Sequence, residues 1–232
     1  MKMAILEATG VGKVYETRGV ETTALDAVDL AVEEGEFAAL AGPSGSGKTT
    51  LLNLLGALDA PSSGEVRLDG ENLADLSPAA LSELRLRKLG FVFQAYNLIP
   101  VFSAAENIEF VMELQGVAAA ERRKRAEELL AEVGLEGLGE KRPLEMSGGQ
   151  QQRVAVARAL ASRPRVILAD EPTANLDSKT AVRLLDLMAE LNGTHGVTFL
   201  FSSHDPLVLE RARRRIWLRD GQIDRIEEGA SA

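Results

Sequence analysis

The chain has 232 residues, 45% of them hydrophobic, and 26 Lys and Arg against 35 Asp and Glu give a formal net charge of −9. A chain of this length buries roughly 70–75% of its unfolded surface and needs no covalent cross-link. It contains no Cys, which excludes disulfides, Cys zinc sites and thiol nucleophiles, and its two His are too few for a His-rich metal site.

The acidic balance argues against nucleic acid as a partner, because nucleic-acid-binding surfaces usually carry clustered positive charge. One Trp, two Tyr and seven Phe are also too few for an extended base-stacking platform. No stretch approaches the roughly 18 apolar residues of a membrane span. Residues 3–6 form an apolar run too short for a signal-peptide core, so we expect a cytoplasmic protein.

The first 70 residues predict strands and turns. Residues 28–33 and 65–70 alternate apolar and polar side chains, which is the period of a half-buried strand. Residues 37–41 form a continuous apolar run, typical of a strand buried on both faces. Residues 103–139 show helical spacing instead and predict a helical insertion. Its apolar face comprises Ala126, Leu129, Leu130 and Val133.

Apolar strands return at residues 166–169 and 197–201, on either side of a predicted helix. We expect this helix to end at Asn192-Gly193, and residues 216–223 to form a closing hairpin. Strands that alternate with helices indicate parallel βαβ units, and so an α/β fold. The buried face of the helix is expected to comprise Ala181, Leu184, Leu185, Met188 and Leu191.

The strongest chemical signal is the segment Gly42–Thr49, which reads GPSGSGKT and matches the pattern G-x-x-x-x-G-K-[ST]. It follows the apolar strand and precedes helical spacing, which is the context that a phosphate-binding loop requires. Its glycines let backbone N–H groups converge on phosphate oxygens, and the helix N-terminus adds partial positive charge. Lys48 would reach the β- and γ-phosphates, and the Thr49 hydroxyl would bind Mg²⁺.

Polar residues follow three other predicted strands. Asp170 and Glu171 come directly after residues 166–169; Asp170 would hold the metal, and Glu171 would polarise the attacking water. Gln94 and His204 follow two further apolar runs. Because the carboxyl ends of parallel strands meet at one sheet edge, we expect all four side chains to lie beside the glycine loop.

A second glycine-containing segment, Ser147-Gly148-Gly149-Gln150, opens another helical pattern. A helix start of this kind suits an anion. The alternative is an ordinary Ser N-cap with no ligand. Because one nucleotide already has the first loop for its phosphates, the residues alone leave the role of this segment open.

In this order, the motifs resemble the ATP-binding subunit of ABC transporters over nearly the whole chain. Tyr15 matches the aromatic that stacks on adenine in that family; the alternative is a strand residue packed in the core. Residues 90–100 and 147–153 look like the lipoprotein-release and macrolide-export branch. The matching motifs are Gly42–Thr49 (Walker A), Gln94 (Q-loop), Ser147–Gln150 (signature), Asp170-Glu171 (Walker B), Asn175–Asp177 (D-loop) and His204 (switch).

The resemblance implies a single domain, residues 1–232, with a P-loop core, an antiparallel β subdomain and an inserted helical subdomain. The first two would occupy 1–94 and 160–232, and the helical subdomain with the signature would occupy 95–159. It also implies that the signature of one chain caps the γ-phosphate bound by another, so that a homodimer forms upon ATP binding around two MgATP.

The resemblance assigns three sets of site residues. Lys48, Glu171 and His204 would be catalytic, and Thr49, Gln94 and Asp170 would hold Mg²⁺. Two departures from the family pattern, Met146 for Leu and Ser203 for Thr, remove no phosphate or metal contact. The expected ATP contacts are Tyr15, Gly42, Ser44, Gly45, Ser46, Gly47, Lys48, Thr49, Thr50, Gln94, Ser147, Gly148, Gly149, Gln150 and Asp177.

The function implied is an ATPase that drives a separate transmembrane permease, in export or lipoprotein extraction, without nucleic acid. The subunit would be peripheral on the cytoplasmic face of the inner membrane. One alternative is a nucleotide-gated scaffold in a membrane cell-wall-control complex. A second is a DNA-repair or ribosome-acting ABC ATPase; those proteins resemble tandem or coiled-coil-bearing chains, whereas each motif occurs once here.

Two surface features are open to alternative interpretations. Basic residues cluster at 122–125 and 211–215, which we interpret as solvated helix faces, with anionic lipid headgroups as the alternative. Residues 95–102 are apolar and follow Gln94. They either tuck under the helical insertion or contact the permease, as the family resemblance implies.

Overall fold

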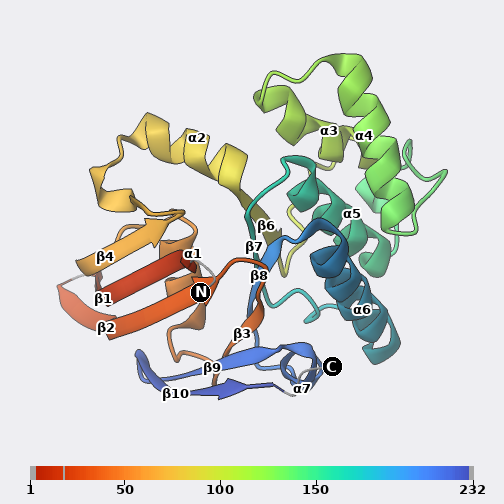
Figure 1. Cartoon of the computed structure of the whole chain (residues 1–232). Helices are drawn as coiled ribbons and strands as arrows, with labels where there is room; N and C mark the ends of the chain where they lie inside the picture. Colours follow the sequence, from red (N-terminus) through yellow and green to blue (C-terminus); the bar gives the residue numbers. More distant parts are fainter. Residues whose placement is uncertain (1–3, 18, 230–232) are drawn as a thin grey trace.

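The computed structural model describes residues 4–17 and 19–229, which form two β-sheets surrounded by helices (Figure 1). The strands are β1 (Ala4–Thr17), β2 (Val20–Glu33), β3 (Phe37–Ala41), β4 (Ser63–Leu68), β5 (Glu71–Asn72), β6 (Leu89–Phe93), β7 (Val166–Asp170), β8 (Thr198–Ser202), β9 (Arg214–Arg219) and β10 (Gln222–Glu228). The α-helices are α1 (Lys48–Leu55), α2 (Pro78–Lys88), α3 (Ala104–Leu114), α4 (Ala119–Glu132), α5 (Gly148–Ala161), α6 (Ser178–His195) and α7 (Pro206–Arg211). Two short 3-10 helices are η1 (Leu73–Asp75) and η2 (Pro143–Glu145).

The larger sheet has the strand order β10-β9-β3-β8-β7-β6, and the smaller has the order β2-β1-β4-β5. In the larger sheet β3, β6, β7, β8 and β9 run parallel, and β10 pairs antiparallel with β9 as the predicted closing hairpin. All pairs of the smaller sheet are antiparallel. The predicted α/β class, with its parallel βαβ units and antiparallel subdomain, is confirmed.

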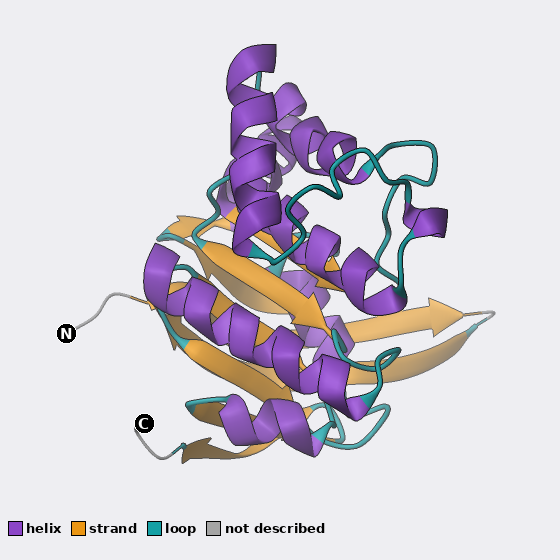
Figure 2. Cartoon of the chain, turned by 90° about the vertical axis from the view of Figure 1, so that its right-hand side faces the viewer, coloured by secondary structure: helices purple, strands orange, loops and turns teal. Residues whose placement is uncertain are grey.

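Alternate residues of the central strands point into two separate cores. On β3, Phe37 and Ala39 join the cluster beneath α5 and α6, whereas Ala38 and Leu40 join the cluster around α1. The Phe37 ring lies 5.6 Å from Phe199 and 4.7 Å from Phe201 between ring centroids. The strands are therefore buried on both faces, as their continuous apolar runs predict. Figure 2 shows the helices that cover one of these faces.

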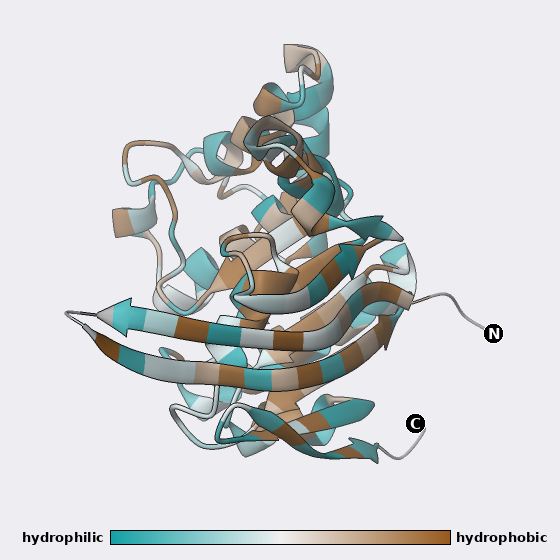
Figure 3. Ribbon diagram, turned by 90° about the vertical axis from the view of Figure 1, so that its left-hand side faces the viewer, coloured by the Kyte–Doolittle hydropathy of each residue, from teal (hydrophilic) through white to brown (hydrophobic). Residues whose placement is uncertain are grey.

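The smaller sheet buries one face only. Val28, Leu30 and Val32 of β2 are buried, and the residues between them are exposed. Figure 3 shows this alternation as bands of hydrophobic and hydrophilic residues along β1 and β2.

Helix α1 contacts strands of both sheets, so its burial fixes where its N-terminus lies relative to the strand ends.

The predicted helical insertion is formed by α3 and α4, which pack on each other and on α5. Ser103 begins α3 in a capping box with Glu106, each side chain accepting from the other's backbone N–H. The predicted apolar face is buried: it comprises Ala126, Leu129 and Leu130 of α4 and Val133, which directly follows α4. None of the described helices has the length and apolar character needed to cross a bilayer.

The expected end of α6 at Asn192-Gly193 is wrong, because the helix continues to His195 and stops at Gly196, whose φ is +65°. Asn192 is buried, and its Nδ2 donates to the carbonyls of Val197 (2.7 Å) and Gly35 (3.1 Å). This polar residue therefore ties α6 to the loops that precede β8 and β3.

Replacing Asn192 by Ala is expected to lower the free energy of unfolding by about 1–3 kcal/mol, because it leaves buried carbonyls unpaired. Urea denaturation measures the change. Gly193→Ala is the matched control on the same helix: a Cβ there meets nothing within 4 Å. Ala should stabilise the helix by roughly 0.5–1 kcal/mol. An Asn192→Ala variant as stable as the unmodified chain would contradict this role.

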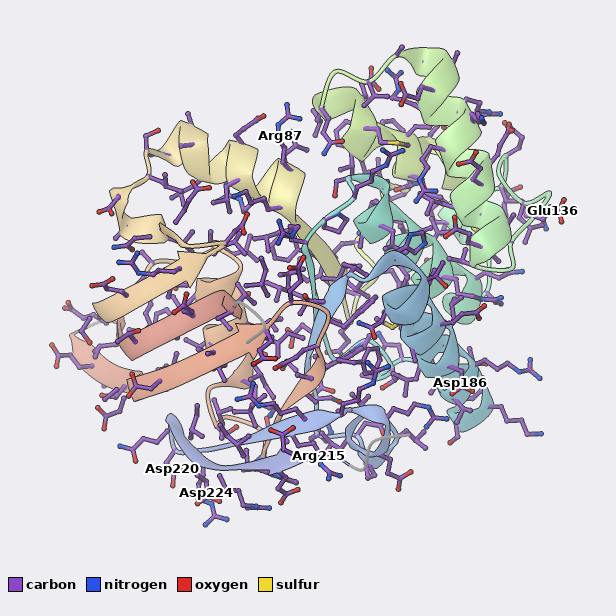
Figure 4. All side chains as sticks on the ribbon, viewed as in Figure 1. Arg87, Glu136, Asp186, Arg215, Asp220 and Asp224 are labelled. Atoms are coloured by element: carbon purple, nitrogen blue, oxygen red, sulfur yellow. The ribbon has the colours of Figure 1, made fainter. Side chains whose placement is uncertain are left out.

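The basic cluster 122–125 lies on α4, as expected, and its cations pair with acidic side chains of α3 and α4 and with Glu140. In the cluster 211–215, only Arg211 lies on a helix; Arg214 and Arg215 lie on β9, so the expected helix face is wrong there. Arg214 pairs with Glu36, and Arg215 pairs with Glu227. Figure 4 shows the labelled charged side chains spread around the periphery in its view.

Candidate nucleotide site

The glycine loop joins the end of β3 to α1, which begins at Lys48. Gly42, Gly45 and Gly47 have φ values of +144°, +80° and +100°, a region that favours glycine. A Cβ on Gly42 would lie 2.2 Å from the Leu218 carbonyl oxygen, and one on Gly47 would lie 2.7 Å from that of Ala24. The loop geometry therefore requires glycine at both positions.

Lys48 is the cation of this loop and is only 6% exposed. Its Nζ donates to the carbonyl oxygens of Gly42 (2.8 Å) and Pro43 (2.9 Å), so the ammonium group is held against the loop. Burial lowers the pKa of Lys48, and the nearby carboxylates of Glu171 and Asp170 partly oppose that shift. The positive charge is thus fixed where phosphate oxygens would enter.

A pocket of about 380 Å³ opens beside the loop. It brings together residues that follow four different parallel strands: the loop after β3, Gln94 after β6, Glu171 after β7 and His204 after β8. The predicted meeting of these side chains at one sheet edge is confirmed. The lining residues are Ala24, Ser44, Gly45, Gly47, Lys48, Thr49, Thr50, Gln94, Glu171, Ala174 and His204.

Two lining residues, Ala24 and Ala174, carry no chemical signal in sequence, and only their place in the fold brings them to the pocket. Among the phosphate, metal and adenine contacts predicted within one chain, four lie outside the lining: Gly42, Ser46, Asp170 and Tyr15. Ser46 is 3% exposed, and its Oγ has no hydrogen-bond partner within the described chain. This hydroxyl is buried inside the loop rather than presented to the pocket.

Thr49 and Asp170 form an oxygen-rich corner of the site. The Thr49 hydroxyl donates to Asp170 Oδ1 at 3.1 Å. Hydroxyl and carboxylate oxygens are the ligand types that Mg²⁺ prefers, so this pair fits a magnesium ion. The backbone oxygen of Gln94 accepts from Asn175 Nδ2 at 2.9 Å, which ties the segment after β6 to the segment after β7.

Both carboxylate oxygens of Glu171 are held by the segment that follows β8. Oε1 lies 2.6 Å from His204 Nδ1, and Oε2 accepts from the Ser203 hydroxyl at 2.9 Å. The φ of Glu171 is +45°, an uncommon conformation for a residue other than glycine and one that clusters at functional sites. In the sequence, Ser203 is only a departure from the family pattern that removes no phosphate or metal contact; in the structure, its hydroxyl positions the Glu171 carboxylate.

The Tyr15 ring is 39% exposed, so the alternative that it packs in the core is wrong. Its hydroxyl donates to Asp59 Oδ2 at 3.0 Å. Partial burial and this contact raise the pKa of Tyr15, so the phenol stays neutral at physiological pH.

Segment 147–150 starts α5 with a capping box: Ser147 Oγ accepts from the Gln150 N–H, and Gln150 Oε1 accepts from the Ser147 N–H. None of its four residues lines the pocket of this chain. A Cβ on Gly149 would lie 2.4 Å from Thr180 Cγ2 on α6, the helix that Asp177 caps. The second glycine segment therefore packs against the first turn of α6, the helix that Asp177 caps, and neither the segment nor Asp177 lines the pocket.

Residues 25–174 match the family model described as "ABC transporter". The chain belongs to the ABC transporter family. It is 46% identical to an uncharacterized ABC transporter ATP-binding protein of Thermotoga maritima, over 96% of this chain and 95% of that protein.

Two named relatives of this ABC transporter domain are the lipoprotein-releasing system ATP-binding protein LolD of Anaeromyxobacter dehalogenans and the macrolide export ATP-binding/permease protein MacB of Syntrophobacter fumaroxidans. The first is 48% identical over 94% of this chain and 92% of that protein. The second is 45% identical over 96% of this chain but only 31% of that protein. The expected branch resemblance is confirmed.

A solved ATP-binding cassette superposes on this ABC transporter domain with a TM-score of 0.90 and 43% identity, covering 98% of this chain and all of that one. That structure is a dimer in a post-hydrolysis state bound to ADP and Pi. The chain is an ATP-binding ABC ATPase with the cassette fold.

In this ABC ATPase, the apolar segment after Gln94 is partly covered: Leu98, Ile99 and Phe102 are half-buried, and Pro100 and Val101 are exposed. Leu98 packs against the core, and the rings of Phe102 and Phe110 meet at 5.7 Å between centroids. Val101, by contrast, is 69% exposed. Of these three side chains, Leu98 is partly covered by the core and Phe102 by α3, whereas Val101 presents an apolar surface.

Proposed function

We propose that two copies of this ATPase enclose two MgATP, and that hydrolysis drives a separate transmembrane permease in export or lipoprotein extraction. The observation that best supports ATP hydrolysis is the position of the Glu171 carboxylate. It lines the pocket, and its two oxygens are held by Ser203 and His204. A carboxylate at this place can accept hydrogen bonds from an attacking water and take its proton.

Each part of the pocket has a task in this proposal. The ammonium group of Lys48 and the loop N–H groups would bind the β- and γ-phosphates and stabilise the charge that develops during transfer to water. His204 would orient Glu171 and the water against the γ-phosphate. Thr49, Asp170 and Gln94 would hold Mg²⁺, which supplies charge neutralisation on the phosphate oxygens when it is bound.

The second glycine segment supports the dimeric part of the proposal. Ser147, Gly148, Gly149 and Gln150 form a helix N-terminus suited to an anion, yet none of them lines their own chain's pocket. We propose that these residues, with Asp177, contact the nucleotide of the partner subunit. We also keep the division into a core, 1–94 and 160–232, and a helical subdomain, 95–159, as a proposal.

The relatives suggest where this ATPase acts. The relative LolD is named as part of a lipoprotein-releasing system, and the relative MacB as an ATP-binding/permease protein for macrolide export. We propose a permease on a separate chain, with this subunit on the cytoplasmic face of the inner membrane. Co-purification with that permease and faster ATP turnover in the complex would support transport; a complex in which the permease leaves turnover unchanged would favour the scaffold alternative.

Val101→Asp is expected to leave the free subunit folded, with unchanged ATP affinity, and to weaken its assembly with the permease. The reason is that Val101 is exposed, so its replacement costs the fold little. Thermal melting and ATP binding on the free subunit are measured first, then co-purification and turnover with the permease.

Leu98→Asp is the matched comparison on the same segment. Because Leu98 packs against the core, a carboxylate there should lower the melting temperature of the free subunit. Normal permease stimulation by the Val101 variant would show that this surface is not the contact.

A further inference from the structure

Three side chains from distant parts of the sequence meet beside β1, just beyond the point where its pairing with β4 ends at Gly12 and Ser63. Lys13 and Tyr15 lie two residues apart on β1, and Asp59 lies in the turn after α1. Asp59 Oδ1 accepts from Lys13 Nζ at 2.8 Å, and Asp59 Oδ2 accepts from the Tyr15 hydroxyl at 3.0 Å. Lys13 Nζ also lies over the Tyr15 ring, 4.9 Å from its centroid, which is within the range of a cation–π contact.

The anchoring cation is better covered than the ring that it holds. The Lys13 side chain is 11% exposed, whereas the Tyr15 residue is 39% exposed. Lys13 Nζ has a further acceptor, the carbonyl oxygen of Ala60 at 2.7 Å. The hydrogen bond from Lys13 is the largest cause that lowers the pKa of Asp59, so this carboxylate stays charged. The ammonium group is therefore fixed, not a freely moving surface charge.

The turn that carries Asp59 is itself fastened to β1. The Ser62 N–H donates to the Gly12 carbonyl at 2.8 Å, and Ser62 Oγ accepts from the Val14 N–H at 3.0 Å. These bonds extend the pairing of β1 with β4, so Asp59 and Tyr15 are held on one rigid frame. Side chains on rigid elements keep their geometry better than those on free loops.

Tyr15 does not line the nucleotide pocket itself, but Lys13 and Val14 pair with Leu25 and Thr23 of β2, and Ala24 between them lines that pocket. The side chain of Thr50, a lining residue, is close enough to the Tyr15 hydroxyl to act on its pKa, where it partly offsets the upward shift. Lys13 Nζ lies over one face of the ring, so a planar base would have to stack on the other face. A ring that is already held in one orientation favours stacking, because ordering a freely rotating ring on binding costs conformational entropy and lowers affinity.

We propose that Asp59 and Lys13 are positioning residues that hold the Tyr15 ring as a platform for the nucleotide base. The proposal rests on the proposed function, in which this chain binds ATP, and on the stacking of Tyr15 on adenine that the family resemblance implies. Neither residue touches the nucleotide in this account; each acts through the ring. Their removal should therefore affect ligands that carry a base and spare ligands that consist of phosphate alone.

The test compares the dissociation constants of ATP and inorganic triphosphate, each with Mg²⁺, for the full chain. Asp59→Ala should weaken ATP binding by about 3- to 30-fold, which is less than the full loss of one base–aromatic stacking contact. It should leave triphosphate binding unchanged. Asp59→Asn retains an acceptor oxygen for the hydroxyl and should lose less. Tyr15→Leu should weaken ATP binding at least as much as Asp59→Ala, and adding Asp59→Ala to it should cost nothing further.

The outcomes separate the positioning role of Asp59 from base stacking by Tyr15. An equal loss of ATP and triphosphate affinity would show that Asp59 acts on the phosphate loop, which overturns the positioning role. A normal ATP affinity in Tyr15→Leu would overturn base stacking, while the proposed ATP binding and turnover would still stand. A loss in Tyr15→Leu but none in Asp59→Ala would overturn the positioning role alone. Lys13→Met provides the same comparison if the Asp59 variants fail to fold.

Discussion

Glu171→Gln is expected to lower ATP turnover by about 10²- to 10⁴-fold, the range for loss of a general base, while ATP affinity is retained. The amide has nearly the shape of the carboxylate and can still contact Ser203, but it cannot take a proton from water. Lys48 and the glycine loop are untouched, so the phosphate contacts stay. Phosphate release and equilibrium ATP binding measure the two effects separately.

Ser203→Ala is the graded control for this result. It removes the hydrogen bond to Glu171 Oε2, together with the acceptor of the Asp205 N–H, and leaves the His204 contact in place. We expect turnover between that of the unmodified chain and that of Glu171→Gln, because the carboxylate is less well oriented but still basic. If Glu171→Gln turned over ATP at nearly the normal rate, the proposed role of Glu171 would be wrong.

Gly148→Asp is expected to lower turnover by about 10²-fold or more and to leave ATP affinity of the isolated subunit nearly unchanged, by analogy with the loss of a charge-stabilising donor. Gly148 begins α5 and does not line its own pocket, so an acid there would repel only a phosphate bound by the partner subunit. A Cβ at this position would lie 2.7 Å from the Tyr96 hydroxyl, the tip of a side chain that can turn aside.

Gly193→Asp is the control for the added charge. It places the same carboxylate on an exposed helical glycine whose Cβ would meet nothing within 4 Å. This variant should bind and hydrolyse ATP normally. A Gly148→Asp variant that loses ATP binding as an isolated subunit would instead show that the second glycine segment serves its own chain's pocket.

The sheet and the pocket were predictable because they depend on local patterns. Alternation along 28–33 identified a half-buried strand, and the apolar runs at 37–41 and 166–169 identified strands buried on both faces. Parallel strands place their carboxyl ends at one edge, so Glu171 and His204 could be expected to meet without knowledge of the exact strand order.

The rest depends on partners that are distant in sequence. Asn192 followed by Gly193 is typical of a helix end. Only the hydrogen bonds of Asn192 to Gly35 and Val197 show that it is a buried residue that joins the helix to two loops. Asp59 lies 44 residues from Tyr15, and no local spacing indicates that they touch. A polar residue is structural or catalytic according to what the fold places beside it, which local patterns do not specify.

The central claim is that two chains enclose ATP, with the second glycine segment of each completing the pocket of the other. Light scattering coupled to size-exclusion chromatography tests it on Glu171→Gln, in which bound ATP is not consumed. With saturating MgATP, we expect a mass twice that of the 24.9 kDa chain, and a return to the single-chain mass, with ATP still bound, when Gly148→Asp is added. A Glu171→Gln chain saturated with ATP that stays at 24.9 kDa would contradict the account.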